Sequence, residues 1–136
     1  MAAFAYFDHD ADIGIIGQGK TLEEAFEGAA AATFAIMADP AQVHREGLVQ
    51  FDFDEEDPEL ALVIWLNTLL AEARTHALVF GQFRLNRENS HWHGEAWGEP
   101  WRDDLDRGVE VKGATLTMLR VSQGPDGFEA RCVVDV

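Results

Sequence analysis

Hydrophobic residues recur at helical spacing in two segments of the chain. The first segment begins with the capping-box sequence Thr21–Glu24 and continues to Met37. Four consecutive small residues at 29–32 predict that this helix lies close against a sheet. The second helix begins at Asp57-Pro58, a capping residue followed by proline at the first helical position. Its hydrophobic stripe extends almost all the way round, which predicts burial on more than one side.

The remaining segments alternate between apolar and polar positions, as strands do. Strand patterns cover residues 5–16, 49–53, 78–85, 92–101, 109–121 and 128–134. We expect the first to be a strand pair and the last two to form a hairpin around the turn Gly124–Gly127. Amphipathic strands joined by short turns favour antiparallel pairing. We therefore predict an α+β fold in which two helices pack on a largely antiparallel or mixed β-sheet, as two layers in a single domain spanning residues 1–136.

The net charge of the chain limits the kinds of molecule that it is expected to bind. The 136 residues include 10 basic and 25 acidic side chains, which give a formal net charge of −15. This charge disfavours direct nucleic-acid binding and anionic membranes, and it favours a basic protein partner or bound cations. The single cysteine, Cys132, excludes an internal disulfide and is expected to be a small buried hydrophobe. With no signal-peptide pattern and no membrane-length apolar run, we expect a cytoplasmic protein.

Two carboxylates and an imidazole gather at His9–Asp12, where the first strand pair is expected to bend. Asp10 and Asp12 share strand parity, so we expect both side chains to point the same way. Crowded carboxylates are relieved by a proton or a cation. A solvated acidic turn has the same composition, and this short segment alone does not separate the two interpretations.

The C-terminal segment Cys132–Val136 is an apolar, β-branched strand that runs to the last residue, which predicts a docked chain end. Such an end carries two adjacent negative groups, the Asp135 side chain and the α-carboxylate of Val136. If it lies beside Asp12, three hard oxygen donors converge, a set that suits Ca²⁺ or Mg²⁺ better than softer metals. The alternative is an edge strand that simply ends in Asp-Val.

Several blocks of the sequence, taken together, resemble the archease family. They occur in the family's order and span nearly the whole chain: His9–Gly14, Gly19–Phe26, Met37–Asp39, Trp65–Leu70, Val79-Phe80, Gly98–Pro100, Val111–Thr115 and Val133–Val136. Two places depart from the family pattern. Asp10 stands where the family usually has Thr, and Leu116-Thr117 replace a Tyr-His pair, so any role of those two side chains cannot be carried over.

Archeases are small acidic accessory proteins of the RtcB-type RNA-splicing ligase, which uses GTP and a divalent metal ion in tRNA splicing and RNA repair. The resemblance implies a non-enzymatic protein that promotes ligase guanylylation and turnover. It also implies a site for a divalent metal ion, Ca²⁺ in a crystal or else Mg²⁺ or Mn²⁺. The implied metal residues are Asp12, Asp135 and Val136, with His9, Asp10 and Lys112 as candidate auxiliary groups.

Two other functions remain open. One is a general chaperone or modulator, a role also proposed for the archease family. The other is a metal-dependent hydrolase that uses Asp10, Asp12 and His9 around a catalytic ion.

Three further residues or motifs have a structural and a functional interpretation. His91-Trp92-His93 places two imidazoles on one strand face, a spacing compatible with a metal, but no third nitrogen or sulfur ligand is evident and surface histidines are the simpler interpretation. Lys112 shares strand parity with an apolar face, so its ammonium group either extends to solvent or pairs with the acidic cluster. Asn67, inside the apolar helix, is expected to satisfy a neighbouring backbone group.

Overall fold

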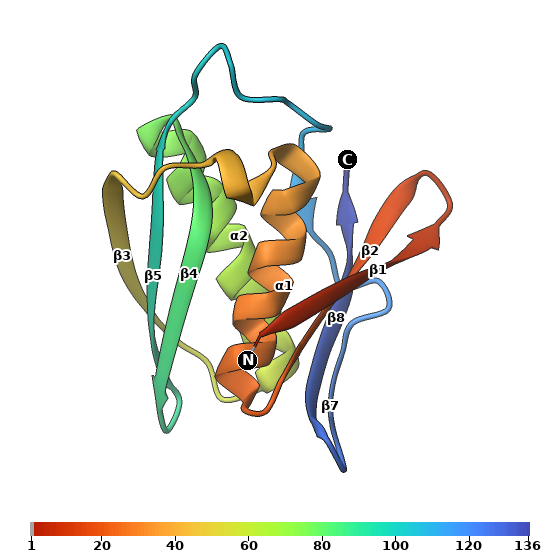
Figure 1. Cartoon of the computed structure of the whole chain (residues 1–136). Coiled ribbons are helices and arrows are strands. Elements are labelled where there is room, and N and C mark those ends of the chain that lie inside the picture. Colours follow the sequence, from red (N-terminus) through yellow and green to blue (C-terminus); the bar gives the residue numbers. More distant parts are fainter. Residues whose placement is uncertain (1) are drawn as a thin grey trace.

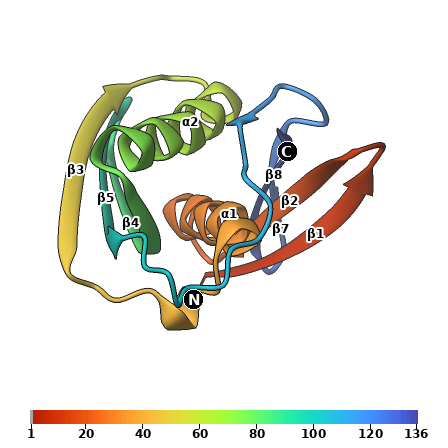
Figure 2. The ribbon, with the colours of Figure 1, turned by 90° about the horizontal axis from the view of Figure 1, so that it is seen from above.

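The chain folds into two antiparallel sheets with two helices between them (Figures 1 and 2). The computed structural model describes residues 2–136. In chain order the elements are β1 (Ala3–His9), β2 (Asp12–Gly19), α1 (Leu22–Met37), the 3₁₀-helix η1 (Pro40–Gln42), β3 (Gly47–Asp54), α2 (Pro58–His76), β4 (Leu78–Glu88), β5 (His91–Pro100), β6 (Gly113–Ala114), β7 (Arg120–Gly124) and β8 (Gly127–Asp135).

The strands divide into two groups. One sheet has the order β1-β2-β8-β6, with β7 also paired to β8, and the other has the order β3-β5-β4. Every strand pair is antiparallel. The predicted α+β class and the two helices packed on antiparallel strands are confirmed. The observed layers differ from the predicted ones. The strands form two sheets on opposite sides of the helices, whereas the sequence predicted a single sheet with both helices on it.

Helix α1 contacts both sheets, which explains why two form. Its small residues lie against β2, where a side chain at Gly17 would meet the backbone of Ala25 and Ala29. On its other side the ring of Phe34 packs 5.5 Å from Phe80 of β4, measured between ring centroids. A helix with one small face and one aromatic face can therefore bury both against different sheets.

Both helices begin where the sequence predicts. The Thr21 side chain accepts a hydrogen bond from the backbone N–H of Glu24 at 3.1 Å, and the Asp57 side chain accepts one from the N–H of Glu59 at 2.9 Å. Each bond satisfies a backbone donor that the first helical turn leaves free. Helix α2 ends at His76, and the capping residue Ala77 has a φ of 54°, in the left-handed region.

Aromatic residues join the two helices to the sheet of β3, β4 and β5. Trp65 of α2 is fully buried and donates from Nε1 to the carbonyl of Phe26 in α1 at 2.9 Å. The ring of Phe26 stacks on that of Trp92 in β5, with centroids 5.2 Å apart. Polar and apolar contacts thus fix the same three elements, and the buried indole N–H has its partner.

The prediction of one continuous strand over residues 109–121 is wrong. Only β6 and β7 form within it, and both pair with β8. Between the pairs Ala114–Val134 and Arg120–Arg131 the register against β8 changes by three residues, so residues 115–119 protrude as a loop. The hairpin of β7 and β8 around Gly124–Gly127 is confirmed.

None of the helices in the described part of the chain is both long and apolar enough to cross a membrane.

Candidate functional site

The start of β2 and the C-terminus meet at one end of the larger sheet. Ile13 near the start of β2 pairs with Val134 near the end of β8, and the same register places Asp12 across from Asp135. The backbone N–H of Val136 donates to Oδ1 of Asp12 at 3.3 Å. The expected position of the C-terminal residues beside Asp12 is confirmed, and the register sets Asp12 opposite Asp135.

Asp10 does not lie in a strand with Asp12, so the strand parity expected for this pair does not apply. Asp10 lies in the turn between β1 and β2 with a φ of 52°, and its side chain is 93% exposed. The turn reverses the chain, so alternation along a strand no longer applies there. The strand partner of Asp12 across the hairpin is instead His9, whose Nδ1 lies 3.8 Å from Oδ2 of Asp10.

Helix α2 holds the other side of the site. Oδ1 of Asn67 accepts from the backbone N–H of Ala114 at 2.8 Å, while its Nδ2 donates to the carbonyl of Ala114 at 3.2 Å. The predicted backbone-satisfying role of Asn67 is therefore confirmed. Because Ala114 pairs with Val134, these bonds fix the strand that lies beside the end of β8.

Sequence reasoning missed a second residue of α2 that holds the same segment. Arg74 donates to the carbonyls of Val111 and Lys112 at 3.0 and 2.6 Å. The backbone N–H of Lys112 in turn donates to the carbonyl of Asp135 at 2.8 Å. A cationic side chain in the last turn of an apolar helix was the available signal, since such a side chain can bind carbonyl groups near that end.

The expected apolar strand face around Lys112 does not form. Regular pairing stops at Ala114, and Lys112, Leu116 and Met118 are all exposed. Among the described residues, the ammonium group of Lys112 forms no ion pair with a carboxylate. Its auxiliary role at the site stays a prediction.

The donor set of Asp12 and the C-terminal residues is of the kind that suits a hard divalent cation. Like charges directly opposite one another on neighbouring strands destabilise a sheet unless something balances them. Asp12, Asp135 and the terminal carboxylate offer only oxygen atoms, which Ca²⁺ and Mg²⁺ prefer. The bond from Val136 uses one oxygen of Asp12 and leaves the second one available. Metal binding at these three residues stays a prediction.

Comparison with known proteins now gives the family. The model of the Archease protein family (MTH1598/TM1083) matches residues 4–136. The chain belongs to the archease family. It is 36% identical to the protein archease of Sulfolobus acidocaldarius and 32% identical to that of Pyrococcus furiosus, with the full length of both chains covered in each comparison.

Solved structures agree with the family. The solution structure of Methanobacterium thermoautotrophicum protein 1598 superposes with a TM-score of 0.83 at 29% identity, covering 98% of this chain and 99% of that one. The crystal structure of a Thermotoga maritima archease, described as a possible chaperone, has a TM-score of 0.68 at 19% identity, which supports the fold alone. It covers 96% of this chain and 94% of the other.

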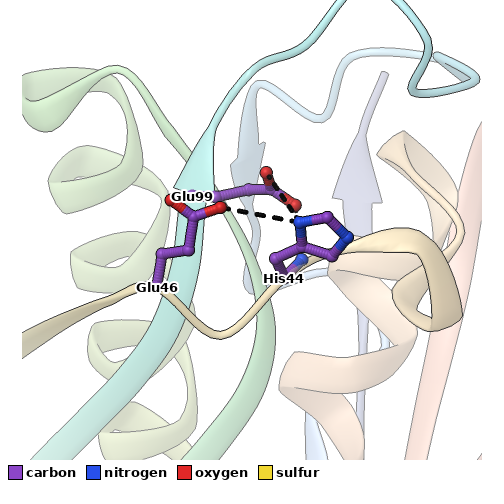
Figure 3. Close-up of side chains that lie close together, drawn as sticks. All are labelled: His44, Glu46 and Glu99. Carbon is purple, nitrogen blue, oxygen red and sulfur yellow. Dashed lines mark hydrogen bonds and ion pairs between the residues drawn. The ribbon is translucent and has the colours of Figure 1, made fainter.

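A second cluster of ionisable groups lies at the opposite sheet of this archease fold (Figure 3). The cluster consists of His44, Glu46 and Glu99, whose candidate ligand atoms all lie within 4.8 Å of one another. Within the part of the chain that the structure describes, it is the group of three His, Cys, Asp or Glu residues that lie this close together. Glu99 is only 1% exposed, yet Arg102 already balances its charge, with Nε 2.7 Å from Oε1. The buried carboxylate therefore has a positive partner within the chain itself.

The Glu99 cluster is a structural clamp. The backbone N–H of His44 also donates to Glu99, and Arg102 reaches the carbonyl of Gln42 at 2.7 Å. One buried carboxylate thus joins the segment after η1 to the segment after β5. Hydrogen bonding to Arg102 holds the pKa of Glu99 below its usual range, which keeps the group ionised. Sequence reasoning missed this clamp, although the spacing of Glu99 and Arg102 was visible.

His91 and His93 lie on the outward face of β5 and hydrogen-bond to carboxylates of β3. Oδ1 of Asp52 lies 3.1 Å from Nε2 of His91 and 2.9 Å from Nδ1 of His93, and Asp54 lies 2.9 Å from the other nitrogen of His91. Hydrogen bonding to Asp54 and Asp52 raises the pKa of His91. The imidazoles therefore have proton-sharing partners on the neighbouring strand, which fits the interpretation as surface histidines.

Cys132 is fully buried in β8, as predicted. Burial raises the pKa of its thiol to about 12. A thiol of this pKa stays protonated near neutral pH and is a poor nucleophile, so Cys132 acts as a small core residue.

Proposed function

We propose that this chain is an accessory protein of an RtcB-type RNA-splicing ligase, and that it promotes ligase guanylylation and turnover without a catalytic side chain of its own. The observation that carries the proposal is the contact between Val136 and Asp12, because it places the C-terminal residues beside a carboxylate of β2. Membership of the archease family supports the same assignment.

The three carboxylates are suited to hold a divalent cation toward the partner. Asp12, Asp135 and the terminal carboxylate would be its ligands, and a bound ion would supply positive charge that anionic groups can share. The fold of the chain contributes by holding these carboxylates in position. Asn67 and Arg74 fix the segment beside β8, so that the carboxylates are presented on a rigid sheet end rather than on a free terminus.

Charge supports a ligase as the partner. An RNA ligase presents a basic surface to its substrate, and a chain with a net charge of −15 is attracted to such a surface over long distances. Binding one ligase conformation better than another is sufficient to shift the ligase toward it. We propose that the conformation favoured in this way is the one competent for guanylylation.

Single-turnover guanylylation of purified ligase tests this proposal. Wild-type protein is expected to accelerate the step, and Asp12→Asn is expected to lose most of that acceleration because it removes one charge from the gathered carboxylates. Asp126→Asn, which makes the same charge change in the exposed turn between β7 and β8, is the matched control. Equal stimulation by wild type and Asp12→Asn would remove the chain-end site from the mechanism.

A general chaperone role is the second candidate, supported by the description of the Thermotoga maritima relative as a possible chaperone. Protection of unrelated client proteins from aggregation would favour it over a dedicated ligase factor. The hydrolase alternative is weakened by the geometry, because Asp10 lies in the turn before β2 and its side chain is almost fully exposed. Turnover of phosphoester substrates by the purified protein alone would restore it.

A further inference from the structure

The loop between β6 and β7 exposes two large apolar side chains. Leu116 is 64% exposed and Met118 is 56% exposed, the two highest values among the large hydrophobic residues that the structure describes. We call this pair the apolar tip. The segment from Gly113 to Leu119 that carries it contains no charged residue, in a chain where 26% of residues are charged.

The apolar tip is held by hydrogen bonds on both sides. Thr115 donates from its hydroxyl to the carbonyl of Val133 at 2.8 Å, and the N–H of Val133 donates to the carbonyl of Thr117 at 3.0 Å. Within the loop, the N–H of Leu119 donates to the carbonyl of Leu116 at 3.3 Å. The loop is therefore held in a defined conformation against the edge of β8.

Met118 has an unfavourable backbone conformation as well as an exposed side chain. Its φ of 55° lies in the left-handed region, which residues with a side chain seldom adopt. Neither the strain nor the exposure of an apolar side chain stabilises the folded chain. Strained residues of this kind are concentrated at sites that bind other molecules.

The apolar tip lies close to Asp135 and the C-terminus. Val133, which binds both sides of the loop, precedes Asp135 by two residues, or about 7 Å along a strand. Figure 2 shows the loop projecting on the side of the sheet where the C-terminus lies. A protein interface of standard size covers roughly 800 Å² on each partner, so one footprint can include both features.

We propose that the apolar tip inserts into an apolar pocket on the partner protein, and that basic groups around this pocket face Asp12, Asp135 and the terminal carboxylate. The proposal rests on the proposed function, in which the partner is the ligase. Apolar anchors inside a polar rim are the usual arrangement at energetic centres of interfaces. Charge disfavours a second copy as the occupant, because two acidic chain ends would then face one another.

The two parts of this surface should affect different rate constants. Charge complementarity mainly raises the association rate and makes it depend on salt, whereas desolvated apolar contacts mainly slow dissociation. The experiment therefore measures both rates with immobilised ligase, at about 0.05 M and about 0.3 M salt.

Three variants separate the contributions. Leu116→Ser with Met118→Asn removes the apolar side chains while Asn tolerates the left-handed backbone, and we expect dissociation to accelerate about tenfold or more with little change in association. Asp135→Asn should instead slow association and reduce its salt dependence. Leu48→Thr replaces an exposed apolar residue on β3, in the other sheet, and should leave both rates unchanged.

The outcomes distinguish this inference from the proposed function. A wild-type protein that fails to bind the ligase overturns both. Wild-type binding with unchanged dissociation of the Leu116/Met118 variant overturns the apolar tip alone, as does an equal effect of Leu48→Thr. Thermal unfolding should show the Met118→Asn single variant to be as stable as wild type, so its dissociation rate decides the matter if the double variant does not fold. A wild-type dimer that Met118→Asn dissociates would assign the tip to self-association instead.

Discussion

Asn67 forms two hydrogen bonds with the backbone of Ala114, one to each of its polar groups, at 2.8 and 3.2 Å. A side-chain amide in α2 therefore replaces a neighbouring strand for a short segment that the sheet does not otherwise complete. Because Ala114 pairs with Val134, the helix fixes the place where the C-terminus lies beside Asp12. The position of the candidate site thus depends on a residue that is not part of it.

Replacing Asn67 by Ala should destabilise the fold. It leaves the N–H and carbonyl of Ala114 without these partners in a half-buried place, which costs about 1–3 kcal/mol of unfolding free energy. Urea unfolding followed by circular dichroism measures the loss. Thr75→Ala, at an exposed position of the same helix, is the control. Equal unfolding free energies for the two variants would show that the amide does not anchor β6.

Extending the chain by one glycine after Val136 should weaken divalent-cation binding. The extension moves the α-carboxylate away from Asp12 and Asp135, and loss of one of three charged ligands should reduce Ca²⁺ affinity about tenfold or more. Isothermal titration calorimetry with Ca²⁺ measures the change. Val136→Ile keeps both the terminal carboxylate and the β-branched side chain and should bind as wild type does. An extended chain with wild-type affinity would exclude the α-carboxylate as a ligand.

The Glu99 clamp should make stability sensitive to acid. Because hydrogen bonding to Arg102 lowers the pKa of Glu99 in the folded state, its contribution is present above the unfolded-state pKa of about 4.3 and is lost as pH falls through the lower folded-state pKa. The difference in unfolding free energy between wild type and Glu99→Gln should therefore shrink between about pH 6 and about pH 3. Unfolding titrations across this range test the sign. A difference that stays constant or grows toward acid contradicts it.

Gly17→Ala should disturb the contact between α1 and β2. The added methyl group meets the backbone of Ala25 and Ala29, which cannot rotate away as a side chain can. Overpacking of this kind costs about 1–3 kcal/mol, so the melting temperature should fall clearly. At Gly124 the added methyl group comes no closer than 4.0 Å to an atom outside its chain neighbours, the carbonyl oxygen of Gly127, so Gly124→Ala should melt close to wild type. Similar melting temperatures for both variants would show that α1 can move off the sheet freely.

Local signals in the sequence determined much of the fold. The caps at Thr21 and Asp57, the strand alternation and the small residues of α1 act over a few residues, so their pattern along the chain was sufficient to predict both helices and most strands. The predicted meeting of Asp12 with the C-terminus also held, because an apolar strand that continues to the last residue requires a partner along its length.

Only the tertiary structure decided how segments far apart in the sequence pair and pack against one another. The division into two sheets, the protruding loop at residues 115–119 and the pairing of Asn67 with Ala114 arise from contacts between residues far apart in the chain. The same holds for the attachment of His44 to Glu99. Each is set by competition for hydrogen-bond partners and buried area in three dimensions, which alternation along a single strand or helix does not encode.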